Sequence, residues 1–356
     1  MRYNRLGKTN IFVSSIGLGT WGFGGFFTAD RTDDSKFIEL ILTALDLGIN
    51  VIDTAEAYGA GHSEEIIGRA LAVRSRDSVI ISTKVSPENL NYKNLILAAE
   101  NSLKRLQTDY IDLYKIHWPN PMIPLEESLE AMDKLITAGK VRFAGVSNFS
   151  LAKIKNARNI YGNIEAVQVE YNLFDRTIEA DILPFCVREN ISLFAYSPLD
   201  QGKLLADQSK QKIMEDISAK YNCSPHQVIL NWLITNQQVI PIPKSMKIDH
   251  LKQNACSADF SLSAEDFITI ADSFHECPIS IPTDLINTDK KGLKAFVPSP
   301  DQLAEEIRKG ESIKPIRVKL SETTKDRYNL VEGKMRYWAW TIAFNGEKPI
   351  AALIRN

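Results

Sequence analysis

Short runs rich in Val and Ile alternate with segments of helical periodicity along most of the chain, and this alternation constrains the fold more than any other feature. The eight runs are SSIGLG (14–19), NVID (50–53), SVIISTK (78–84), YIDLYKIH (110–117), VRFAGVS (141–147), AVQVE (166–170), ISLFAY (191–196) and QVIPIP (238–243). Between them, apolar residues recur at helical spacing, as in SKFIELILTALDLG and LEESLEAMDKLITAGK. Both segments reach a Gly before the next run, which is a common helix stop.

The spacing of the runs predicts a barrel. The first five end near residues 19, 53, 84, 117 and 147, so the steps between them are 34, 31, 33 and 30 residues. Each step fits one strand and one helix of a right-handed βα unit, and eight such units predict a closed (β/α)₈ TIM barrel, an α/β fold, over residues 1–275. The alternative is a doubly wound open sheet, but GTWGFGG after the first run lacks the G-x-G-x-x-G spacing typical of that fold.

The rest of the 356-residue chain predicts a second, small module. Residues 276–299 are rich in Pro and lack clear periodicity, so we interpret them as a linker. Residues 300–356 contain a helix pattern, DQLAEEIRKG, and strand patterns, IKPIRVKL and PIAALI, which predict a compact α+β C-terminal module. Because about 57 residues are few for an independent core, we expect the module to dock on the barrel or on a partner.

Charge and composition exclude several classes of function. The net charge of −2 provides no global field for nucleic acid or for an anionic membrane. The four cysteines are isolated, without metal-ligand spacing, and the five histidines do not cluster, so no metal site and no disulfide framework are predicted. The N-terminal segment lacks an apolar signal core, and no run approaches about 18 apolar residues, so we expect a cytoplasmic protein that does not enter a membrane.

Four reactive side chains follow the ends of three predicted strands, where the catalytic groups of such barrels lie. Asp53 ends NVID, Lys84 ends SVIISTK, His117 ends YIDLYKIH, and Tyr58 lies five residues beyond Asp53. Any one of them alone could be structural, but four on one rim indicate a site that reduces a carbonyl, because the developing alkoxide needs a proton donor and electrostatic stabilisation.

The four residue types suit different parts of that reaction. A phenol with an ordinary pKa near 10 is a weak acid at neutral pH. A neighbouring ammonium lowers the pKa of the phenol, and Lys84 can act in this way on Tyr58 if Asp53 keeps the lysine charged and oriented. His117 can donate a hydrogen bond to the substrate oxygen and position it.

The chain resembles the aldo-keto reductase superfamily over about residues 1–275. The matching stretches are GINVIDTAEAYGAGHSEEIIGRAL, VIISTKV, SLKRLQTDYIDLYKIHWP, LITAGKVRFAGVSNFS, VQVEYNLFDR, AYSPLDQGKL and VIPIPKS. The resemblance implies an oxidoreductase that reduces an aldehyde or ketone to an alcohol with NAD(P)H. It also implies a catalytic tetrad of Asp53, Tyr58, Lys84 and His117, with Tyr58 as the proton donor.

The same resemblance implies a groove for NADPH, with NADH as an alternative. The residues implied to contact the cofactor are Gly19, Thr20, Trp21, Asp53, Ser147, Asn148, Gln168, Tyr196, Ser197, Pro198, Leu199, Gly202, Lys203, Ile242, Pro243, Lys244, Ser245, His250, Gln253 and Asn254. In this arrangement Ser147, Asn148 and Gln168 bind the nicotinamide carboxamide, Tyr196 stacks on the ring, and the segment 197–203 wraps the pyrophosphate. The alternative for Tyr196 is a core aromatic.

At the adenosine end, Lys244 and Ser245 suit a ribose 2′-phosphate. Many members of the family have an Arg where this chain has His250 and a Glu where it has Gln253. Because a histidine is a weaker and pH-dependent phosphate partner than a guanidinium, dual use of NADPH and NADH is compatible with the sequence.

The resemblance also places Trp21, Tyr58, His117 and Trp118 around the substrate. Aromatic walls favour an apolar carbonyl compound, and the alternative for each tryptophan is core packing. The sequence does not select a particular carbonyl compound, because barrel loops determine the shape of the pocket.

Residues 300–356 resemble the small ParB-like or sulfiredoxin-like fold through LAEEIRKGESIKPIRV and YNLVEGKMRYWAW. In that fold a G-x-x-R turn leads into a helix whose N-terminus can hold a phosphate, so a phosphate or nucleotide ligand near Gly333–Arg336 is one interpretation. A structural lid or an element for homo-oligomer formation is the other. The turn lacks the Cys that sulfiredoxin-type chemistry needs.

Two rival functions remain open at this point. The barrel could be a redox-sensing or regulatory subunit that binds the cofactor and turns over slowly, and an intact tetrad does not separate a sensor from a reductase. A ParB-like nucleic-acid binder is less favoured, because the lysines and arginines of the C-terminal part form no continuous basic run.

Overall fold

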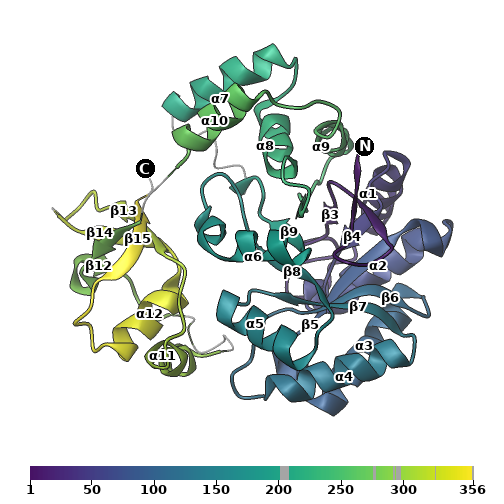
Figure 1. Ribbon diagram of the computed structural model, residues 1–356, viewed down its shortest axis with the longest axis horizontal. Coiled ribbons are helices and arrows are strands. Elements are labelled where there is room, and N and C mark those ends of the chain that lie inside the picture. Colours follow the sequence, from purple (N-terminus) through teal and green to yellow (C-terminus); the bar gives the residue numbers. More distant parts are fainter. Residues whose placement is uncertain (201–207, 276–277, 292, 294–297, 325, 355–356) are drawn as a thin grey trace. The chain divides into compact units, whose positions relative to one another are not determined.

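The computed structural model describes residues 1–200, 208–275, 278–291, 293, 298–324 and 326–354. The implied cofactor contacts of Gly202 and Lys203 therefore lie outside the described residues. The chain divides into two compact units: one spans Met1–Pro119 and Ile123–Phe274, and the other contains His275–Asn356 (Figure 1).

The first unit is a (β/α)₈ barrel, as the spacing of the apolar runs predicts. Its eight parallel strands pair in chain order. They are β3 (Leu18–Gly19), β4 (Val51–Asp53), β5 (Ile80–Val85), β6 (Ile111–Ile116), β7 (Val141–Ser147), β8 (Ile164–Glu170), β9 (Ser192–Tyr196) and β10 (Val239–Pro241). Hydrogen bonds from Gly17 N to Pro241 O (2.9 Å) and from Gly19 N to Pro243 O (3.2 Å) join the first strand to the last and close the sheet. A hairpin of β1 (Tyr3–Arg5) and β2 (Phe12–Ser14) precedes the barrel.

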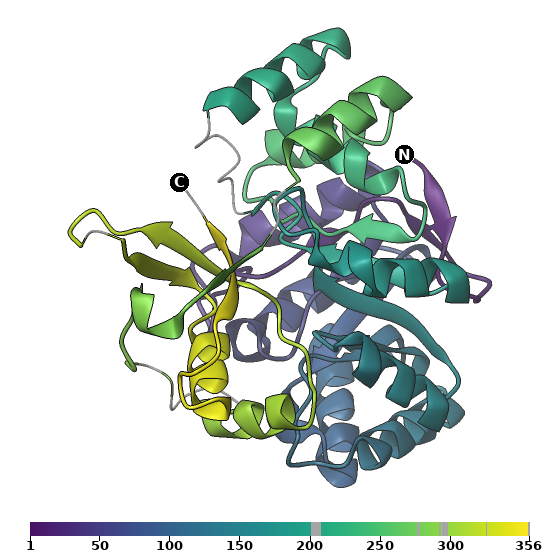
Figure 2. The ribbon, with the colours of Figure 1, turned by 60° about the vertical axis from the view of Figure 1, so that its left-hand side comes forward.

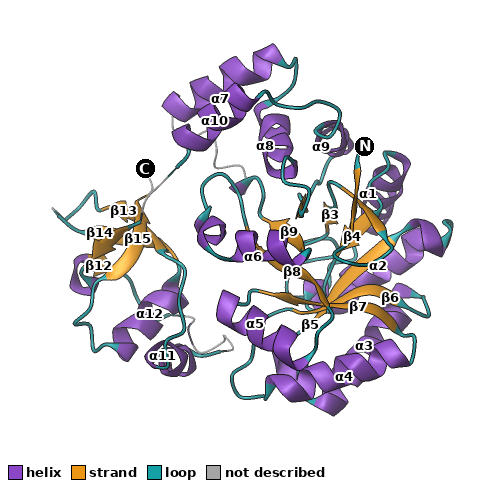
Figure 3. Cartoon of the chain, in the orientation of Figure 1, coloured by secondary structure: helices purple, strands orange, loops and turns teal. Residues whose placement is uncertain are grey.

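Helices surround these strands, as Figure 3 shows. The helices are α1 (Asp34–Asp46), α2 (His62–Leu71), α3 (Tyr92–Leu106), α4 (Leu125–Thr137), α5 (Leu151–Ile160), α6 (Ile182–Glu189), α7 (Gln208–Lys220), α8 (Pro225–Ile234), α9 (Ile248–Cys256) and α10 (Ala264–Ser273). Short 3₁₀ turns lie at Tyr58–Gly61 (η1), Arg76–Ser78 (η2), Pro87–Asn89 (η3) and Thr177–Ala180 (η4). The two predicted helix stops are observed, because Gly48 follows α1 and Gly139 follows α4, each with positive φ (83° and 72°). Within the described ranges, no helix is both long and apolar enough to span a bilayer.

Part of the barrel interior is filled by a cluster of apolar side chains, which we call the apolar plug. Its buried members are Leu6, Ile11, Val13, Val51, Ile80, Leu113, Ala166, Phe194, Ile240 and Ile242. Because side chains alternate along a strand, the next inward positions toward the C-terminal ends carry polar groups: Asp53 after Val51, Lys115 after Leu113 and Gln168 after Ala166. The apolar plug thus forms a floor beneath the polar side chains of the site.

In its described residues, the second unit is a five-stranded sheet with two helices, which Figures 1 and 2 show on one side of that sheet. The strand order is β11 (Ile279–Ile281), β15 (Ile350–Ile354), β13 (Ile316–Leu320), β14 (Tyr328–Glu332) and β12 (Ile286–Asn287). The helices are α11 (Pro300–Arg308) and α12 (Lys334–Ala343), and a short turn lies at Thr283–Leu285 (η6). Side chains of the sheet and of α12 form a small core that includes Ile316, Val318, Tyr337 and Ile350.

The segment 276–299 differs from the linker that its composition suggests. Its strand β11 pairs with β15, and its strand β12 pairs with β14. These strands contain three and two residues, which is too short for an alternating pattern to be recognised. Their partners come later in the chain, so the pairing could not be inferred from local sequence. The described part of this segment therefore belongs to the sheet of the second unit.

We expect a chain that ends at Phe274 to fold as a barrel and to bind NADPH. All eight barrel strands and the hydrogen bonds that close the sheet precede this residue. Circular dichroism and the fluorescence of bound NADPH would measure folding and binding in the truncated and full-length proteins. A truncated protein that is unfolded and binds no cofactor would show that the second unit is required for the barrel core.

Candidate active site

The ends of β4, β5 and β6 bring together the four side chains that the sequence singled out. Asp53 is the last residue of β4, Lys84 is in β5, His117 follows β6, and Tyr58 begins η1. The Lys84 Nζ lies 2.7 Å from Asp53 Oδ1 and 3.2 Å from Tyr58 Oη. The rings of Tyr58 and His117 are 5.8 Å apart between centroids. The predicted rim is therefore one cluster, in which both Lys84 and His117 lie close to Tyr58.

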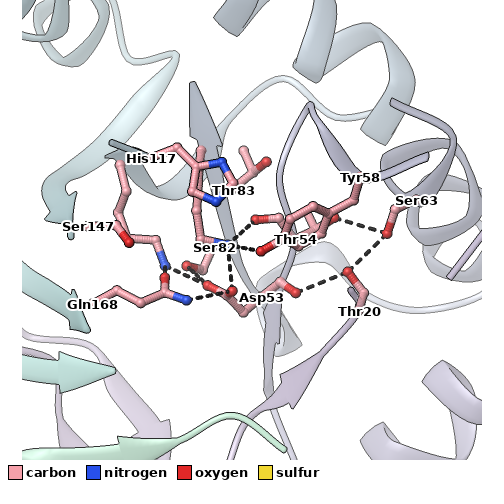
Figure 4. A network of polar contacts seen from close by, with 12 residues as sticks. Thr20, Asp53, Thr54, Tyr58, Ser63, Ser82, Thr83, His117, Ser147 and Gln168 are labelled. Atoms are coloured by element: carbon pink, nitrogen blue, oxygen red, sulfur yellow. Dashed lines mark hydrogen bonds and ion pairs between the residues drawn. The ribbon is translucent and has the colours of Figure 1, made fainter. Parts of the chain in front are cut away.

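Asp53 is the centre of this cluster (Figure 4). Its carboxylate is 2% exposed and has four side-chain partners. Oδ1 accepts from Lys84 and from Gln168 Nε2 (3.1 Å), and Oδ2 accepts from Ser82 Oγ (2.9 Å) and from Lys115 Nζ (2.5 Å). Because partners from β5, β6 and β8 occupy both oxygens of the carboxylate, Asp53 holds Lys84 in place beside Tyr58.

Lys115 was not anticipated from the sequence. Its side chain is fully buried, and its Nζ donates to Asp53 and to Gln168 Oε1. A search confined to strand ends overlooks it, because Lys115 lies two residues before the end position His117. The available signal was the period of two: in YIDLYKIH, Leu113, Lys115 and His117 share one face, and a lysine on the inner face of a barrel strand needs a partner inside.

Burial and the two ammonium groups determine the ionisation of the cluster. Burial alone would raise the pKa of the Asp53 carboxyl, but Lys115 and Lys84 hold it well below its usual range. Burial would likewise lower the pKa of Lys84, but Asp53 and Tyr58 raise it above its ordinary value. Burial, helped by the Lys84 ammonium, lowers the pKa of His117 to about 3. At neutral pH the cluster therefore contains a carboxylate, a charged Lys84 and a neutral imidazole.

The pKa of Tyr58 differs from the simplest expectation. Burial raises the pKa of the phenol above its ordinary value, and the Lys84 ammonium lowers it only in part. The neighbouring ammonium could be predicted from the sequence, whereas the burial of the phenol could not. The consequence is that Tyr58 retains its proton at neutral pH and is available as a donor.

At the ends of β7 and β9, three of the residues implied to face a nicotinamide lie together. Tyr196 Oη donates to Asn148 Oδ1 (2.9 Å), and Asn148 Nδ2 donates to Ser147 Oγ (3.0 Å) and to His117 O (3.0 Å). Gln168 differs from these three residues, because the oxygen and the nitrogen of its side-chain amide both form hydrogen bonds within the Asp53 cluster. Its observed contacts thus support the cluster itself.

The other implied cofactor residues lie along the same rim. Gly19, Thr20 and Trp21 end or follow β3, and the Thr20 Oγ1 donates to Asp53 O (3.0 Å). Ser197, Pro198 and Leu199 follow β9, Ile242 and Pro243 follow β10, and His250, Gln253 and Asn254 are on α9.

Lys244 and Ser245 lie between β10 and α9. Ser245 is buried, and its Oγ donates to Lys247 O (2.6 Å), so it shapes the turn before α9. Lys244 is exposed, although partial desolvation lowers the pKa of its ammonium, which lies 5.5 Å from the centroid of the Phe26 ring. In the described parts of the chain, no carboxylate lies within ion-pair distance of Lys244.

Aromatic side chains stand beside Tyr58. The centroid of the Trp21 ring lies 4.8 Å from that of Tyr58. It also lies 5.5 Å from the centroid of Phe26 and 5.4 Å from that of Phe27. Phe27 is 79% exposed, and Trp118, which follows His117, is also exposed. Phe26 and Phe27 were missed from the sequence, although FGGFF after the first strand was the available signal. We call Trp21, Phe26, Phe27 and Trp118 the aromatic wall.

Comparison with known proteins identifies the barrel. The profile of the aldo/keto reductase family matches residues 15–274. The chain belongs to the aldo/keto reductase family.

Relatives of known sequence cover the same region. Over 272 residues the chain is 36% identical to the methylglyoxal reductase YeaE of Escherichia coli, an alignment that covers 76% of this chain and 93% of that one. It is 42% identical over 224 residues to the aldo-keto reductase YhdN of Bacillus subtilis, which covers 60% of this chain and 67% of the relative.

Solved aldo/keto reductases have the same fold. A thermostable aldo-keto reductase in complex with the inhibitor epalrestat has a TM-score of 0.75 and 41% identity, covering 77% of this chain and all of that one. An aldo/keto reductase of Klebsiella pneumoniae in complex with NADP and acetate has a TM-score of 0.71 and 34% identity, covering 77% of this chain and 96% of that one. The family match ends at Phe274, the last residue of the barrel unit, so residues 275–356 lie outside it.

Proposed function

We propose that this aldo/keto reductase reduces an aldehyde or ketone to an alcohol with NADPH, and that Tyr58 is the proton donor. One observation carries the proposal: the phenol oxygen of Tyr58 lies 3.2 Å from the Lys84 ammonium, and the Tyr58 ring lies 5.8 Å from the His117 ring between centroids. The Klebsiella pneumoniae relative, which was solved with NADP, supports the choice of cofactor.

The residues present suit such a cofactor. Tyr196 offers a ring face beside the amide of Asn148, and that amide in turn donates to the backbone oxygen of His117. Lys244 offers an ammonium to which the described residues bring no carboxylate, so it can bind the anionic ribose 2′-phosphate. When bound, NADPH supplies the hydride that reduces the carbonyl carbon.

Side chains of this protein orient the carbonyl group and supply the proton. His117 donates a hydrogen bond to the carbonyl oxygen and orients it. Tyr58 Oη transfers its proton to that oxygen as negative charge develops there, which yields the neutral alcohol. The Lys84 ammonium, held by Asp53, stabilises the phenolate that remains on Tyr58. The phenolate then regains a proton from solvent before the next turnover.

The aromatic wall favours apolar or aromatic carbonyl compounds, because it presents exposed rings beside the proton donor. A relative named methylglyoxal reductase supports adding small dicarbonyl compounds to the candidates. A steady-state screen of aldehydes and ketones with NADPH and with NADH, followed by nicotinamide absorbance, tests the proposal. Tight cofactor binding without turnover on any carbonyl would instead favour a redox-sensing subunit.

We expect Lys244→Met to weaken NADPH binding about 10–100-fold and to leave NADH binding almost unchanged. Only NADPH carries the 2′-phosphate, and a hydrogen bond to a charged group contributes about 1.5–3 kcal/mol. Calorimetric titration of both cofactors measures the effect, with Lys247→Met as a control because Lys247 is an exposed lysine three residues away. An equal loss for NADH would show that Lys244 does not distinguish the two cofactors.

The second unit has a proposed role of its own. The resemblance to ParB-like domains suggests a phosphate or nucleotide ligand at Gly333–Arg336, but the observed contacts support a structural turn. Arg336 Nη1 donates to Pro315 O (2.8 Å), and Glu332 pairs with Arg317 (2.6 Å) and with Arg336 (3.5 Å). Titration of the full chain with inorganic phosphate, compared with Arg336→Gln, would separate the two roles.

Self-association and a cytoplasmic location are likewise proposals that rest on the sequence.

A further inference from the structure

We propose that Lys115 is a positioning residue of the reductase site, which holds Oδ2 of Asp53 and so determines how strongly that carboxylate acts on Lys84 and Tyr58. The inference rests on the proposed function, because it concerns the proton donor of that reaction. It adds a fifth residue to the tetrad and assigns a role to a buried charge that the mechanism does not otherwise use.

The contacts of Lys115 place it beneath the proton donor without touching it. Its Nζ is 2.5 Å from Asp53 Oδ2, while Lys84 bonds the other oxygen of the same carboxylate. Its second acceptor is Gln168 Oε1, and the Gln168 Nε2 returns to Asp53 Oδ1. Lys115, Gln168 and Asp53 thus form a closed ring of hydrogen bonds. Lys115 can act on Tyr58 only through Asp53 and Lys84.

The barrel interior is shaped to accept this lysine. A Cβ added to Gly145 on β7 would lie 2.8 Å from the Ala166 backbone oxygen and 2.9 Å from Lys115 Cγ, so the absence of a side chain there leaves space for the neighbouring strand and for the aliphatic stem. Below it, Phe194 of the apolar plug places its ring centroid 4.8 Å from the ammonium, which is a favourable cation–π distance. If this position only had to be filled, an apolar side chain would fit and would avoid the cost of burying a charge.

The charges around Lys115 do not balance. Among the described residues that face it, Asp53 on β4 is the carboxylate, Lys84 on β5 is a second ammonium, and His117 on its own strand is neutral. The neighbours from β7, β8 and β9 are Gly145, Gln168 and Phe194, which carry no charge. When both lysines are protonated, one carboxylate therefore serves two ammonium groups in a buried site.

This imbalance makes Lys115 titratable near neutral pH. Burial, with the Lys84 ammonium acting in the same direction, lowers the pKa of Lys115 to about 7. Asp53 raises the pKa of Tyr58, and a charged Lys115 offsets part of that influence. Tyr58 should therefore be a stronger acid when Lys115 is protonated, and a weaker one when it is neutral.

A pH series on Lys115→Met tests this role. We expect turnover about tenfold below that of the unaltered protein near pH 6, and a difference that closes by about pH 8.5, where Lys115 of the unaltered protein has lost its charge. Lys115→Arg keeps a charge at every pH and should restore turnover near pH 6. Lys140→Met is the matched control, because Lys140 pairs with Glu100 (2.6 Å) at a partly exposed site away from Asp53.

A second measurement does not depend on turnover. Nuclear magnetic resonance of the full chain with ¹³C-labelled lysine should show one side-chain signal that titrates near pH 7, which Lys115→Met removes and Tyr58→Phe retains. The inference is overturned if no lysine titrates between about pH 6 and 8, or if Lys115→Met lowers turnover equally at all pH values. Failure of the proposed function would appear separately, as full turnover in Tyr58→Phe with the lysine titration unchanged.

Discussion

Tyr58→Phe is expected to lower carbonyl reduction by about 10²–10⁴-fold and to leave NADPH affinity nearly unchanged, since a general acid typically contributes a factor of this size. The substitution removes only the Oη that lies 3.2 Å from Lys84 and keeps the ring that packs against Trp21. Single-turnover kinetics with a saturating cofactor would measure the chemical step, and fluorescence titration would measure binding.

The matched control for this experiment is Tyr110→Phe. Tyr110 lies just before β6, and its Oη donates to Asp77 (2.8 Å) at an exposed site far along the strand from His117. We expect this variant to retain full activity. If Tyr58→Phe keeps more than about half of its turnover, another group supplies the proton, and the assignment of Tyr58 is wrong.

Asp53→Asn is expected to lower the free energy of unfolding by about 3–5 kcal/mol, the usual cost of removing one partner from a buried ion pair. In the described structure, Asp53 is the carboxylate that binds both Lys84 and Lys115. An amide leaves two buried ammonium groups without a counter-charge. Chemical denaturation at several pH values would measure the change, and turnover should fall at the same time because Lys84 loses its orientation.

The loss of stability in Asp53→Asn should depend on pH, and the direction of this dependence follows from Lys115. Without Asp53 the pKa of Lys115 falls further in the folded protein, while in the unfolded chain it stays near 10.4. The unfolded state then binds more protons at intermediate pH, so stability rises with pH and the deficit should be larger at about pH 6 than at about pH 9. Lys84→Met is the comparison, because Lys115, Ser82 and Gln168 still hold Asp53 in that variant. A deficit in Asp53→Asn no larger than in Lys84→Met would contradict the shared-carboxylate arrangement.

The barrel could be predicted from the sequence because its regularity is local. Each strand ends where an apolar run ends, and reactive side chains at run ends, such as Asp53 and Lys84, meet on one rim for geometric reasons. Lys115 was missed because it lies two residues before the strand end, although its inward position follows from the period of two. Burial of Tyr58 could not be inferred either, since it depends on how η1 packs. The two short strands of the second unit were missed because their partners lie up to 73 residues further along the chain, as the pairing of Ile279 with Ala352 shows.

The position of the aromatic wall matters for protein engineering. The acid, the two lysines and their carboxylate are fixed by strands and by the 3₁₀ turn η1, whereas Phe26 and Phe27 project from the connection between β3 and α1. Exposed side chains on such a connection can be exchanged with little effect on stability, because they are not part of the core. A library that varies these two positions would therefore explore new substrates while the proton-transfer apparatus stays the same. Substitutions at these two positions could therefore also change the substrate range during evolution while the catalytic residues stay in place.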